Sequence, residues 1–291
     1  MAHRLKRITA FDVVNYILLG LLTFIIVYPF YYIVINSFNG LLTHRPSFFW
    51  PEAPTVRTYK TVFSDDSLLM AFFVSVARTV CGTLLTVTCT SLCAYALSKP
   101  YLRFRNFYMA FLIVPTFFNG GTIPVYLNLK ALHLVDSFLV YIFPNAFTFF
   151  YMVMLMSAFR NVPSTLEDAS LIDGAGCWRI FVQIILPVTI PTFATIALYA
   201  AVGQWNQWYD TMYYTNKDSL QTLASVLMRI IRENLGTEMA SDMMSDLENN
   251  SFNPEGVKFA TMVVSVTPIL CIYPFLQRYF VKGVMIGSIK G

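Results

Sequence analysis

The chain has 291 residues, of which 56% are hydrophobic and only 12% charged, and its formal net charge is +4. Soluble globular domains carry about a quarter charged residues, so this composition excludes an ordinary water-exposed protein. The basic residues stand singly between apolar runs and form no cluster or stripe, which argues against a nucleic-acid partner. The composition favours a protein that is surrounded by lipid.

The N-terminal residues 1–12 are basic and precede an apolar run at about residues 14–35. This run is longer than the apolar part of a signal peptide, and no small-residue cleavage site follows it. We therefore interpret it as a first membrane span that is retained.

Further apolar runs of spanning length follow along the whole chain. They lie at about residues 79–97, 107–127, 137–158, 182–203 and 257–280. Backbone polar groups in hydrocarbon must bond within their own segment, and these runs lack the polar alternation of barrel strands, so each run predicts a helix. We predict an all-α integral membrane protein in which residues 1–291 form a single transmembrane domain with six spans.

The positions of lysine and arginine between the spans predict the orientation. One side carries an excess of basic residues in short segments, namely Arg4, Lys6, Arg7, Lys99, Arg103, Arg105, Arg160, Arg179, Arg278, Lys282 and Lys290. On the other side acidic residues match or outnumber the basic ones, with eight acidic residues between Asp210 and Glu255. The first side is therefore predicted to be cytoplasmic, and an even number of spans places both termini there.

Two segments on the outer side are long enough to have structure of their own. Residues 37–67 contain several prolines and aromatics and predict an ordered surface loop, and Arg78, which follows it, is expected to extend its guanidinium to the outer interface. The external loop at residues 205–256 has apolar residues at helical spacing over residues 219–235. It is interpreted either as a lid that packs on the helices or as a surface for a partner.

The loop at residues 160–181, between the fourth and fifth spans, has the signals of a short helix. Ser164 and Glu167 have the spacing of a capping box, and Gly174 is suited to end the helix. Leu166, Ala169 and Ser170 then share one side of it. These signals alone predict a capped surface helix, for which an ordinary connector is the simpler interpretation.

The same loop resembles the EAA loop of ABC importer permeases, whose pattern is E-A-A, three residues, G, nine residues and I-x-L-P. Aligned on Gly174, the chain has Asp168-Ala169-Ser170 in place of E-A-A and Ile184-Ile185-Leu186-Pro187 at the required distance. The resemblance implies the type I ABC importer permease fold, with this loop as the coupling helix that docks a separate ATPase. The residues to which it assigns this role are Leu166, Glu167, Asp168, Ala169, Ser170, Asp173 and Gly174.

Other stretches are similar to the maltose-type carbohydrate permeases, in particular the smaller six-span subunit. These stretches are residues 94–99, residues 159–163 and the pair Trp205-Asn206, while residues 282–291 resemble a branch that is linked to complex oligosaccharides, including pectin fragments. The resemblance implies a permease subunit of a binding-protein-dependent importer for oligosaccharides in a prokaryotic cell membrane. In such an importer, ATP hydrolysis by a partner drives alternating access.

The resemblance also implies the partners: a second permease subunit that is a different chain, two ABC ATPase subunits or domains, an extracytoplasmic sugar-binding protein and membrane lipid. The chain lacks the G-x-x-x-x-G-K-[ST] loop that cradles phosphates, so ATP and Mg²⁺ are expected on the ATPase. No cofactor, metal or catalytic residue is expected in this chain, and it is not an enzyme by itself.

Sugar recognition requires aromatic faces for the ring together with amides or hydroxyls for its hydroxyl groups. Residues of these types at suitable depth are Asn119, Asn145, Tyr151, Tyr199, Gln204, Trp205 and Asn206. Each of them is also explained as a packing or interface residue in a chain that is 16% aromatic. They are our candidates for the substrate pathway.

The sequence argues against two other functions and leaves a third open. A secondary transporter would need carboxylates deep in its spans, and no Asp or Glu lies deep in a predicted span. A membrane enzyme would need clustered His, Cys or acids, whereas His3, His44 and His133 are far apart and the five cysteines imply no disulfide framework. An ABC permease for amino acids, peptides or metals is the alternative that stays open.

Overall fold

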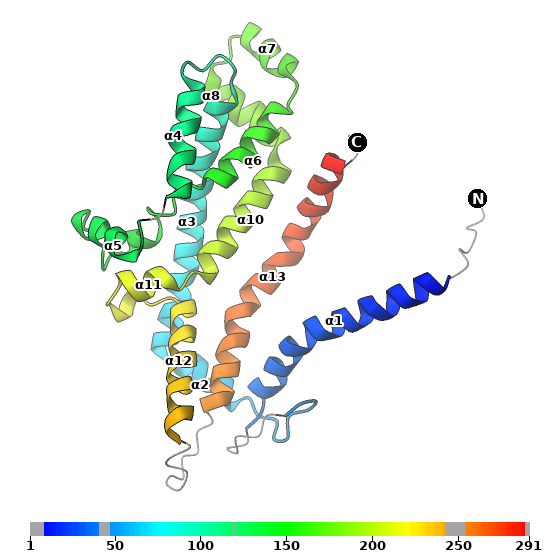
Figure 1. The fold of residues 1–291 in the computed structure, drawn as a ribbon, viewed down its shortest axis with the longest axis vertical. Coiled ribbons are helices and arrows are strands. Elements are labelled where there is room, and N and C mark those ends of the chain that lie inside the picture. Colours follow the sequence, from blue (N-terminus) through cyan, green and yellow to red (C-terminus); the bar gives the residue numbers. More distant parts are fainter. Residues whose placement is uncertain (1–8, 41–46, 119, 242–253, 289–291) are drawn as a thin grey trace. The chain divides into compact units, whose positions relative to one another are not determined.

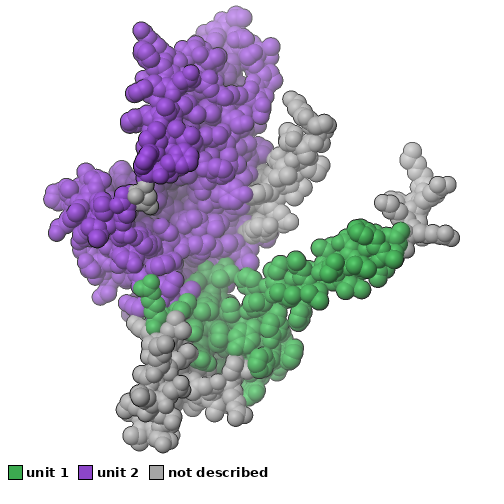
Figure 2. Space-filling view, in the orientation of Figure 1, with its two compact units in different colours: residues 1–65, 230–266 green, residues 66–229, 267–291 purple. Residues whose placement is uncertain are grey.

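The computed structural model describes residues 9–40, 47–118, 120–241 and 254–288. Within these ranges the chain is helical and has no β-strand, apart from an isolated bridge between Asn39 and Pro54 (Figure 1). The prediction of an all-α protein is confirmed. The chain divides into two compact units, one formed by residues 1–65 and 230–266 and the other by residues 66–229 and 267–291 (Figure 2).

The first unit is organised on α1 (Ala10–Ser37), which begins with a capping box between Thr9 and Asp12. The apolar side chains of α1 are exposed along its length, as expected of a helix that faces lipid. At its end, the Asn36 side chain bonds both the N–H and the C=O of Ser47, at 2.9 and 3.0 Å. The Thr58 hydroxyl of α2 (Arg57–Ser64) donates to the Ser37 carbonyl at 2.6 Å. These bonds order the described part of the predicted surface loop.

The second unit is built around α3 (Asp66–Ser98), against which α6 (Phe149–Arg160) and α10 (Ile190–Asn206) pack (Figure 1). Its interior is filled by apolar side chains that are fully buried, among them Ala94, Met152, Leu155, Ile185 and Ile196. A cluster of aromatic rings, Tyr95, Phe159 and Phe181, closes this interior toward the last turn of α3. Helix α4 (Arg105–Phe117) packs on α6.

The apolar run at residues 107–127 is not one helix. It is divided between α4 and α5 (Thr122–Ala131), which meet at a bend of 119°. Gly121 has φ +87°, a conformation that glycine adopts without strain, and Pro115 and Pro124 remove backbone donors on either side of the bend. Hydropathy registers apolar character but not these breaks, so the prediction of a continuous third helix is wrong.

The run at residues 137–158 is helical only in its second half. A short 3₁₀ turn, η1 (Phe138–Tyr141), is followed by irregular backbone around Pro144, and α6 begins only at Phe149. Pro144 lacks the N–H that a continuous helix would use here. The fourth predicted span therefore contains a helix of 12 residues, which is too short to cross a membrane alone.

The run at residues 182–203 is bent as well. Helix α8 (Cys177–Ile180) continues through a π-helical turn, η2 (Phe181–Ile185), into α9 (Leu186–Val188), and α10 follows after a bend of 84°. Thr189 lies at the bend, between Pro187 and Pro191, and its hydroxyl donates to the Ile185 carbonyl at 2.6 Å. The two prolines explain the kink.

The remaining elements are α7 (Ser164–Ile172), α11 (Tyr209–Tyr214), η3 (Asp218–Leu220), α12 (Leu223–Ser241) and α13 (Pro254–Ser288). Three helices of the described chain are long and apolar enough to cross a membrane, and the two bent pairs raise the number to five. The structure thus has three to five candidate spans where the sequence predicted six.

Candidate functional site

Helix α7 and the turn after it form one end of the second unit (Figure 1). Gly174 follows the helix with φ +75°, its N–H donates to the Leu171 carbonyl at 3.0 Å, and the next N–H, of Ala175, donates to Ser170 at 2.9 Å. A left-handed residue with this bond pattern is a typical helix end at which glycine is favoured. The prediction that Gly174 ends the helix is confirmed.

The predicted capping box of α7 is wrong. The helix begins at Ser164 itself, the capping position belongs to Pro163, and no side chain bonds the free N–H groups. Since Ser164 lies inside the first turn, its spacing to Glu167 has no capping function. Glu167 instead pairs with Lys99, which directly follows the end of α3, and the Lys99 ammonium lies 4.4 Å from the ring centre of Tyr95.

No residue of α7 is buried. Ser170 is half-buried, and its hydroxyl donates to the Leu166 carbonyl of its own helix at 2.7 Å. The other predicted coupling residues apart from Glu167 are exposed, namely Leu166, Asp168, Ala169, Asp173 and Gly174. Ile172 is 87% exposed, and Leu171 and Trp178 add to the exposed apolar surface. A surface of this kind is typical of a contact with another protein.

A second feature is a cavity of about 220 Å³ lined by residues of α3, α6, α10 and the irregular segment before α6. It brings together three of the predicted pathway residues, Asn145, Tyr151 and Gln204. Its other lining residues are Thr86, Thr148, Ala200, Gly203 and Gln207. The Thr86 hydroxyl donates to the Asn145 carbonyl at 2.7 Å, so α3 holds the irregular segment in place. Amides, hydroxyls and one aromatic ring in a cavity are suited to a sugar.

The other four predicted pathway residues do not line this cavity. Asn119 lies outside the described residues. Tyr199 and Asn206 are exposed, and Trp205 packs edge-on against Phe72 with the ring centres 6.1 Å apart.

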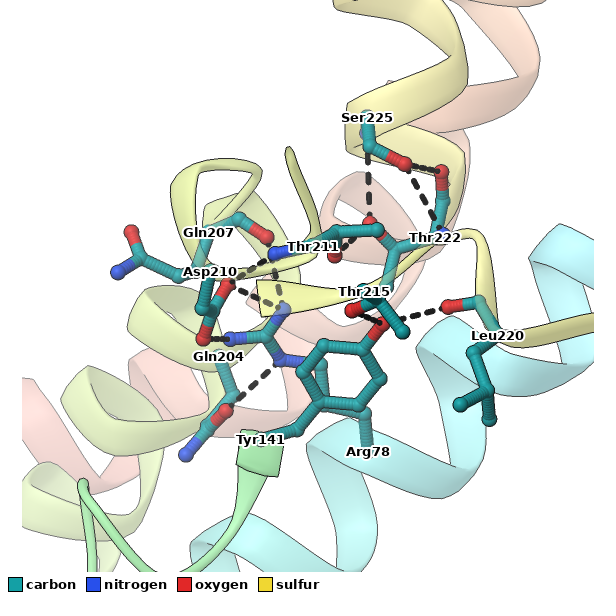
Figure 3. Close-up of polar contacts among 10 residues, drawn as sticks. All are labelled: Arg78, Tyr141, Gln204, Gln207, Asp210, Thr211, Thr215, Leu220, Thr222 and Ser225. Atoms are coloured by element: carbon teal, nitrogen blue, oxygen red, sulfur yellow. Dashed lines mark hydrogen bonds and ion pairs between the residues drawn. The ribbon is translucent and has the colours of Figure 1, made fainter. Parts of the chain in front are cut away.

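Arg78 corrects an expectation from the sequence. Its side chain does not extend to an interface but is buried, with 1% of the residue exposed. Figure 3 shows Gln204, Gln207 and Asp210 converging on its guanidinium. The Nε group donates to the Gln204 amide oxygen at 3.0 Å, Nη1 donates to the Gln207 carbonyl at 2.9 Å, and both Nη groups donate to the Asp210 carboxylate at 3.0 and 2.5 Å.

The network continues beyond Arg78 (Figure 3). The guanidinium carbon lies 4.6 Å from the centre of the Tyr141 ring, and the Tyr141 hydroxyl donates to the Leu220 carbonyl at 2.6 Å. The Asp210 carboxylate also accepts the Thr211 N–H at 3.1 Å. Burial raises the pKa of the Asp210 carboxyl, and the Arg78 guanidinium lowers it by a smaller amount. The ion pair therefore depends on its bidentate geometry and on the additional bonds around it.

Sequence reasoning missed Thr86, Thr148, Gln207 and Asp210. Gln204 and Gln207 are three residues apart and Arg78, Gly82 and Thr86 recur every four residues, so helical spacing alone would have placed each set on one face. That the two faces meet follows only from the packing of α3 against α10. Within the part of the chain that the structure describes, no group of three or more His, Cys, Asp or Glu could hold a metal ion.

Comparison with known proteins identifies the family. Residues 82–286 match the family described as the inner membrane component of binding-protein-dependent transport systems. This match covers more than half of the chain. The chain belongs to this family. The predicted membership of the ABC importer permeases is thereby confirmed, and the inner membrane component described here is a multi-pass helical membrane protein.

Relatives of this inner membrane component match it over nearly its full length. Protein LplC of Bacillus subtilis (strain 168) is 37% identical and the match covers 99% of this chain and 98% of LplC. The polygalacturonan/rhamnogalacturonan transport system permease protein YtcP of the same organism is 35% identical, with 97% and 98% covered. A solved chain of a bacterial ABC transporter involved in the import of the acidic polysaccharide alginate has a TM-score of 0.84 at 28% identity, with 96% and 99% covered.

Proposed function

We propose that this chain is the transmembrane permease subunit of a binding-protein-dependent ABC importer for carbohydrates, with oligosaccharides as the substrates. ATP hydrolysis by a partner ATPase drives the permease between inward- and outward-open states. Support comes from similar proteins whose names state transport of polygalacturonan, rhamnogalacturonan and alginate. The alternative substrates, amino acids, peptides and metals, are stated by none of these names.

The observation that carries the proposal is the geometry of α7. It is a short helix without a buried residue, ended by a left-handed glycine and attached to α3 through the Lys99–Glu167 pair. A short helix with no buried residue, held to the bundle by an ion pair, is suited to dock another protein and to transmit its movement. We assign α7 as the coupling helix, with Leu166, Asp168, Ala169, Ser170, Asp173 and Gly174 on or near the ATPase contact.

The cavity supports the proposed substrate. Irregular backbone at membrane depth is tolerated where it is buried in protein or lines a cavity. Asn145 and Thr148 belong to such irregular backbone and line the cavity directly before α6. We therefore assign Asn145, Tyr151 and Gln204 as sugar contacts, and we count α6 with the irregular segment before it as one span, which gives six.

The remaining assignments follow from this function. The partners are a second permease of different sequence, two ABC ATPase subunits that bind ATP and Mg²⁺, and an extracytoplasmic sugar-binding protein. Both termini and α7 face the cytoplasm of a prokaryotic cell. The permease itself carries no catalytic residue, metal or cofactor.

Replacing Gly174 tests the coupling role. Apart from the two neighbouring residues, no group of the described chain lies within 4 Å of a Cβ added at Gly174, so the space there is open, although the left-handed φ strains a residue with a side chain. In the complete importer in liposomes, Gly174→Leu is expected to reduce sugar-dependent ATPase activity and uptake more than tenfold while membrane insertion is normal. Gly174→Ala is the matched control, because alanine has the same backbone strain at this left-handed position without the bulk of leucine, and it should lose less activity. Wild-type uptake by Gly174→Leu would refute the docking role.

The substrate class is tested with the same wild-type importer. Its ATPase activity is measured with galacturonan and alginate oligomers, a neutral maltodextrin, an amino-acid mixture, peptides and divalent metals, each with its binding protein. We expect stimulation by an oligosaccharide. Stimulation by an amino acid, peptide or metal and by no sugar would overturn the proposal.

A further inference from the structure

The Arg78 guanidinium lies behind one wall of the cavity. It is not among the lining residues, but two of its acceptors are parts of Gln204 and Gln207, whose residues line the cavity. The arginine is therefore placed to influence the cavity without touching what it contains. The coupling role proposed for α7 does not explain why Arg78 bonds these two cavity residues.

The bond to Gln204 fixes the orientation of a cavity amide. An amide side chain can present either its oxygen or its NH₂ group, but arginine has only donors. Because Arg78 Nε bonds the Gln204 oxygen, the NH₂ group of Gln204 is directed away from Arg78. A Cβ added to Gly82 would lie 2.6 Å from this nitrogen, so the bare backbone of Gly82 leaves just enough space for it. The amide is held from both sides.

The bond to Gln207 fixes the backbone where the chain leaves α10. Gln207 directly follows the helix, and its carbonyl accepts from Arg78 at 2.9 Å. Asp210, on the next short helix, holds the same guanidinium from the other side and is itself 5% exposed. Arg78 thus fixes the position of two parts of the cavity wall, the Gln204 side chain and the Gln207 backbone.

We propose that Arg78 is a positioning residue for the sugar site: it directs the Gln204 amide donor and holds Gln207 at the cavity, while Asp210 keeps the guanidinium in place. This inference rests on the proposed function for the identity of the ligand, but not for the position of the two glutamines. The ligand of this site is an oligosaccharide, whose hydroxyl or carboxylate oxygens accept a hydrogen bond from the Gln204 NH₂ group.

The first test needs no substrate. In a background without the five native cysteines, Gln207→Cys and, separately, Gly203→Cys are labelled with a methanethiosulfonate reagent, with Arg78 present or replaced by Gln. Both positions line the cavity, and only position 207 bonds Arg78, through its backbone. Arg78→Gln should raise the labelling rate at position 207 roughly tenfold, which corresponds to the lower end of the free energy of about 1.5–3 kcal/mol for one charged hydrogen bond, and leave the rate at position 203 unchanged. The proposal would be overturned if the labelling rate at position 207 is the same with Arg78 as with Gln at position 78, or if the rates at positions 203 and 207 rise equally.

The second test measures uptake of the oligosaccharide that stimulates the wild-type importer. Arg78→Lys keeps the charge but lacks the fork that reaches Gln204 and Asp210 together, and it should raise the KM about tenfold with a much smaller change in kcat. Gly82→Ala displaces the Gln204 amide without changing Arg78 and should raise the KM similarly. Gly20→Ala on α1, where an added Cβ meets nothing within 4 Å, is the control substitution.

The double variant separates positioning from general damage. If both changes act through Gln204, the fold increase in KM of the double variant, Gly82→Ala with Arg78→Lys, is well below the product of the fold increases of the two single variants. Multiplicative effects, or a loss confined to kcat, would overturn the positioning role. If no oligosaccharide stimulates the wild-type importer, the proposed function fails, and the labelling rates at positions 203 and 207 still decide the role of Arg78.

Discussion

Two ion pairs fasten α3, and they are of opposite kinds. Toward its beginning, the Arg78 and Asp210 side chains are 1% and 6% exposed, and Arg78 bonds three residues and lies over the Tyr141 ring. Directly after its end, the Lys99 and Glu167 side chains are 9% and 20% exposed, and their partner helix α7 has no buried residue. The first site is a network of several bonds, whereas the second consists of one ion pair and one ring contact beside a helix without a buried residue.

The contrast indicates which part of the second unit is rigid. Several bonds to one buried cation hold it in a single position, since each bond would have to break before the group could turn. The Lys99–Glu167 site has one ion pair and one ring contact, so fewer interactions have to break before α7 can turn. About 30 Å of helix without an internal proline separates the two pairs. We infer that α3 is anchored at the cavity and attached to α7 by a joint that can move.

The largest effect is expected from breaking the anchored end. Asp210→Ala leaves the Arg78 guanidinium buried without its charge partner, which typically costs about 3–5 kcal/mol of stability. The melting temperature of the purified protein in detergent should fall by roughly 10 °C. Thermal unfolding followed by tryptophan fluorescence measures this change.

Asp218→Ala is the matched control for this loss. Asp218 is an acidic residue of the same segment between α10 and α12, and it is exposed. Its replacement should shift the melting temperature by no more than about 2 °C. A shift of Asp210→Ala within that range would show that the buried pair does not anchor α3.

Breaking the Lys99–Glu167 pair is expected to cost less stability but to reduce sugar-dependent ATPase activity. Glu167→Ala should lower stability by less than Asp210→Ala does, about 1–2 kcal/mol, because the Lys99 ammonium that it leaves without its charge partner is 7% exposed and keeps its contact with the Tyr95 ring. Sugar-dependent ATPase activity should nevertheless fall several-fold, since α7 is no longer held to α3. The exchange Lys99→Glu with Glu167→Lys restores the pair and should recover part of the activity. If sugar-dependent ATPase activity is the same in Glu167→Ala, in the exchanged pair and in the wild type, the Lys99–Glu167 pair does not link α7 to α3 functionally.

Much of the fold was predictable because hydropathy records burial in lipid directly. The first and last apolar runs lie within α1 and α13, and the second lies within α3, which begins earlier than its apolar stretch. The breaks were not predictable from hydropathy, because Pro144 and Gly121 interrupt the backbone without reducing apolar character. The positions of proline and glycine carry that signal.

The site was predictable where the signal is local. Gly174 and the short helix before it follow from residues adjacent in the sequence. The pairing of Arg78 with Asp210 joins positions 132 residues apart, and that of Lys99 with Glu167 joins positions 68 apart. A single sequence contains no record of such distant contacts. Nothing next to Arg78 in the sequence indicates that its side chain is buried against Asp210.

The finest test compares the two tyrosines that cover the two cations. The Tyr141 ring lies over Arg78 and the Tyr95 ring over Lys99, at 4.6 and 4.4 Å, so a phenylalanine keeps the ring contact at either position. Only the hydroxyls differ: that of Tyr141 donates to the Leu220 carbonyl at 2.6 Å in buried surroundings, whereas that of Tyr95 reaches the Cys177 carbonyl at 3.4 Å in an exposed contact. Tyr141→Phe should therefore cost about 1–2 kcal/mol and Tyr95→Phe less than about 0.5 kcal/mol. If thermal unfolding shows equal losses of stability for the two variants, the sites around Arg78 and Lys99 do not differ in rigidity as their hydrogen bonds indicate.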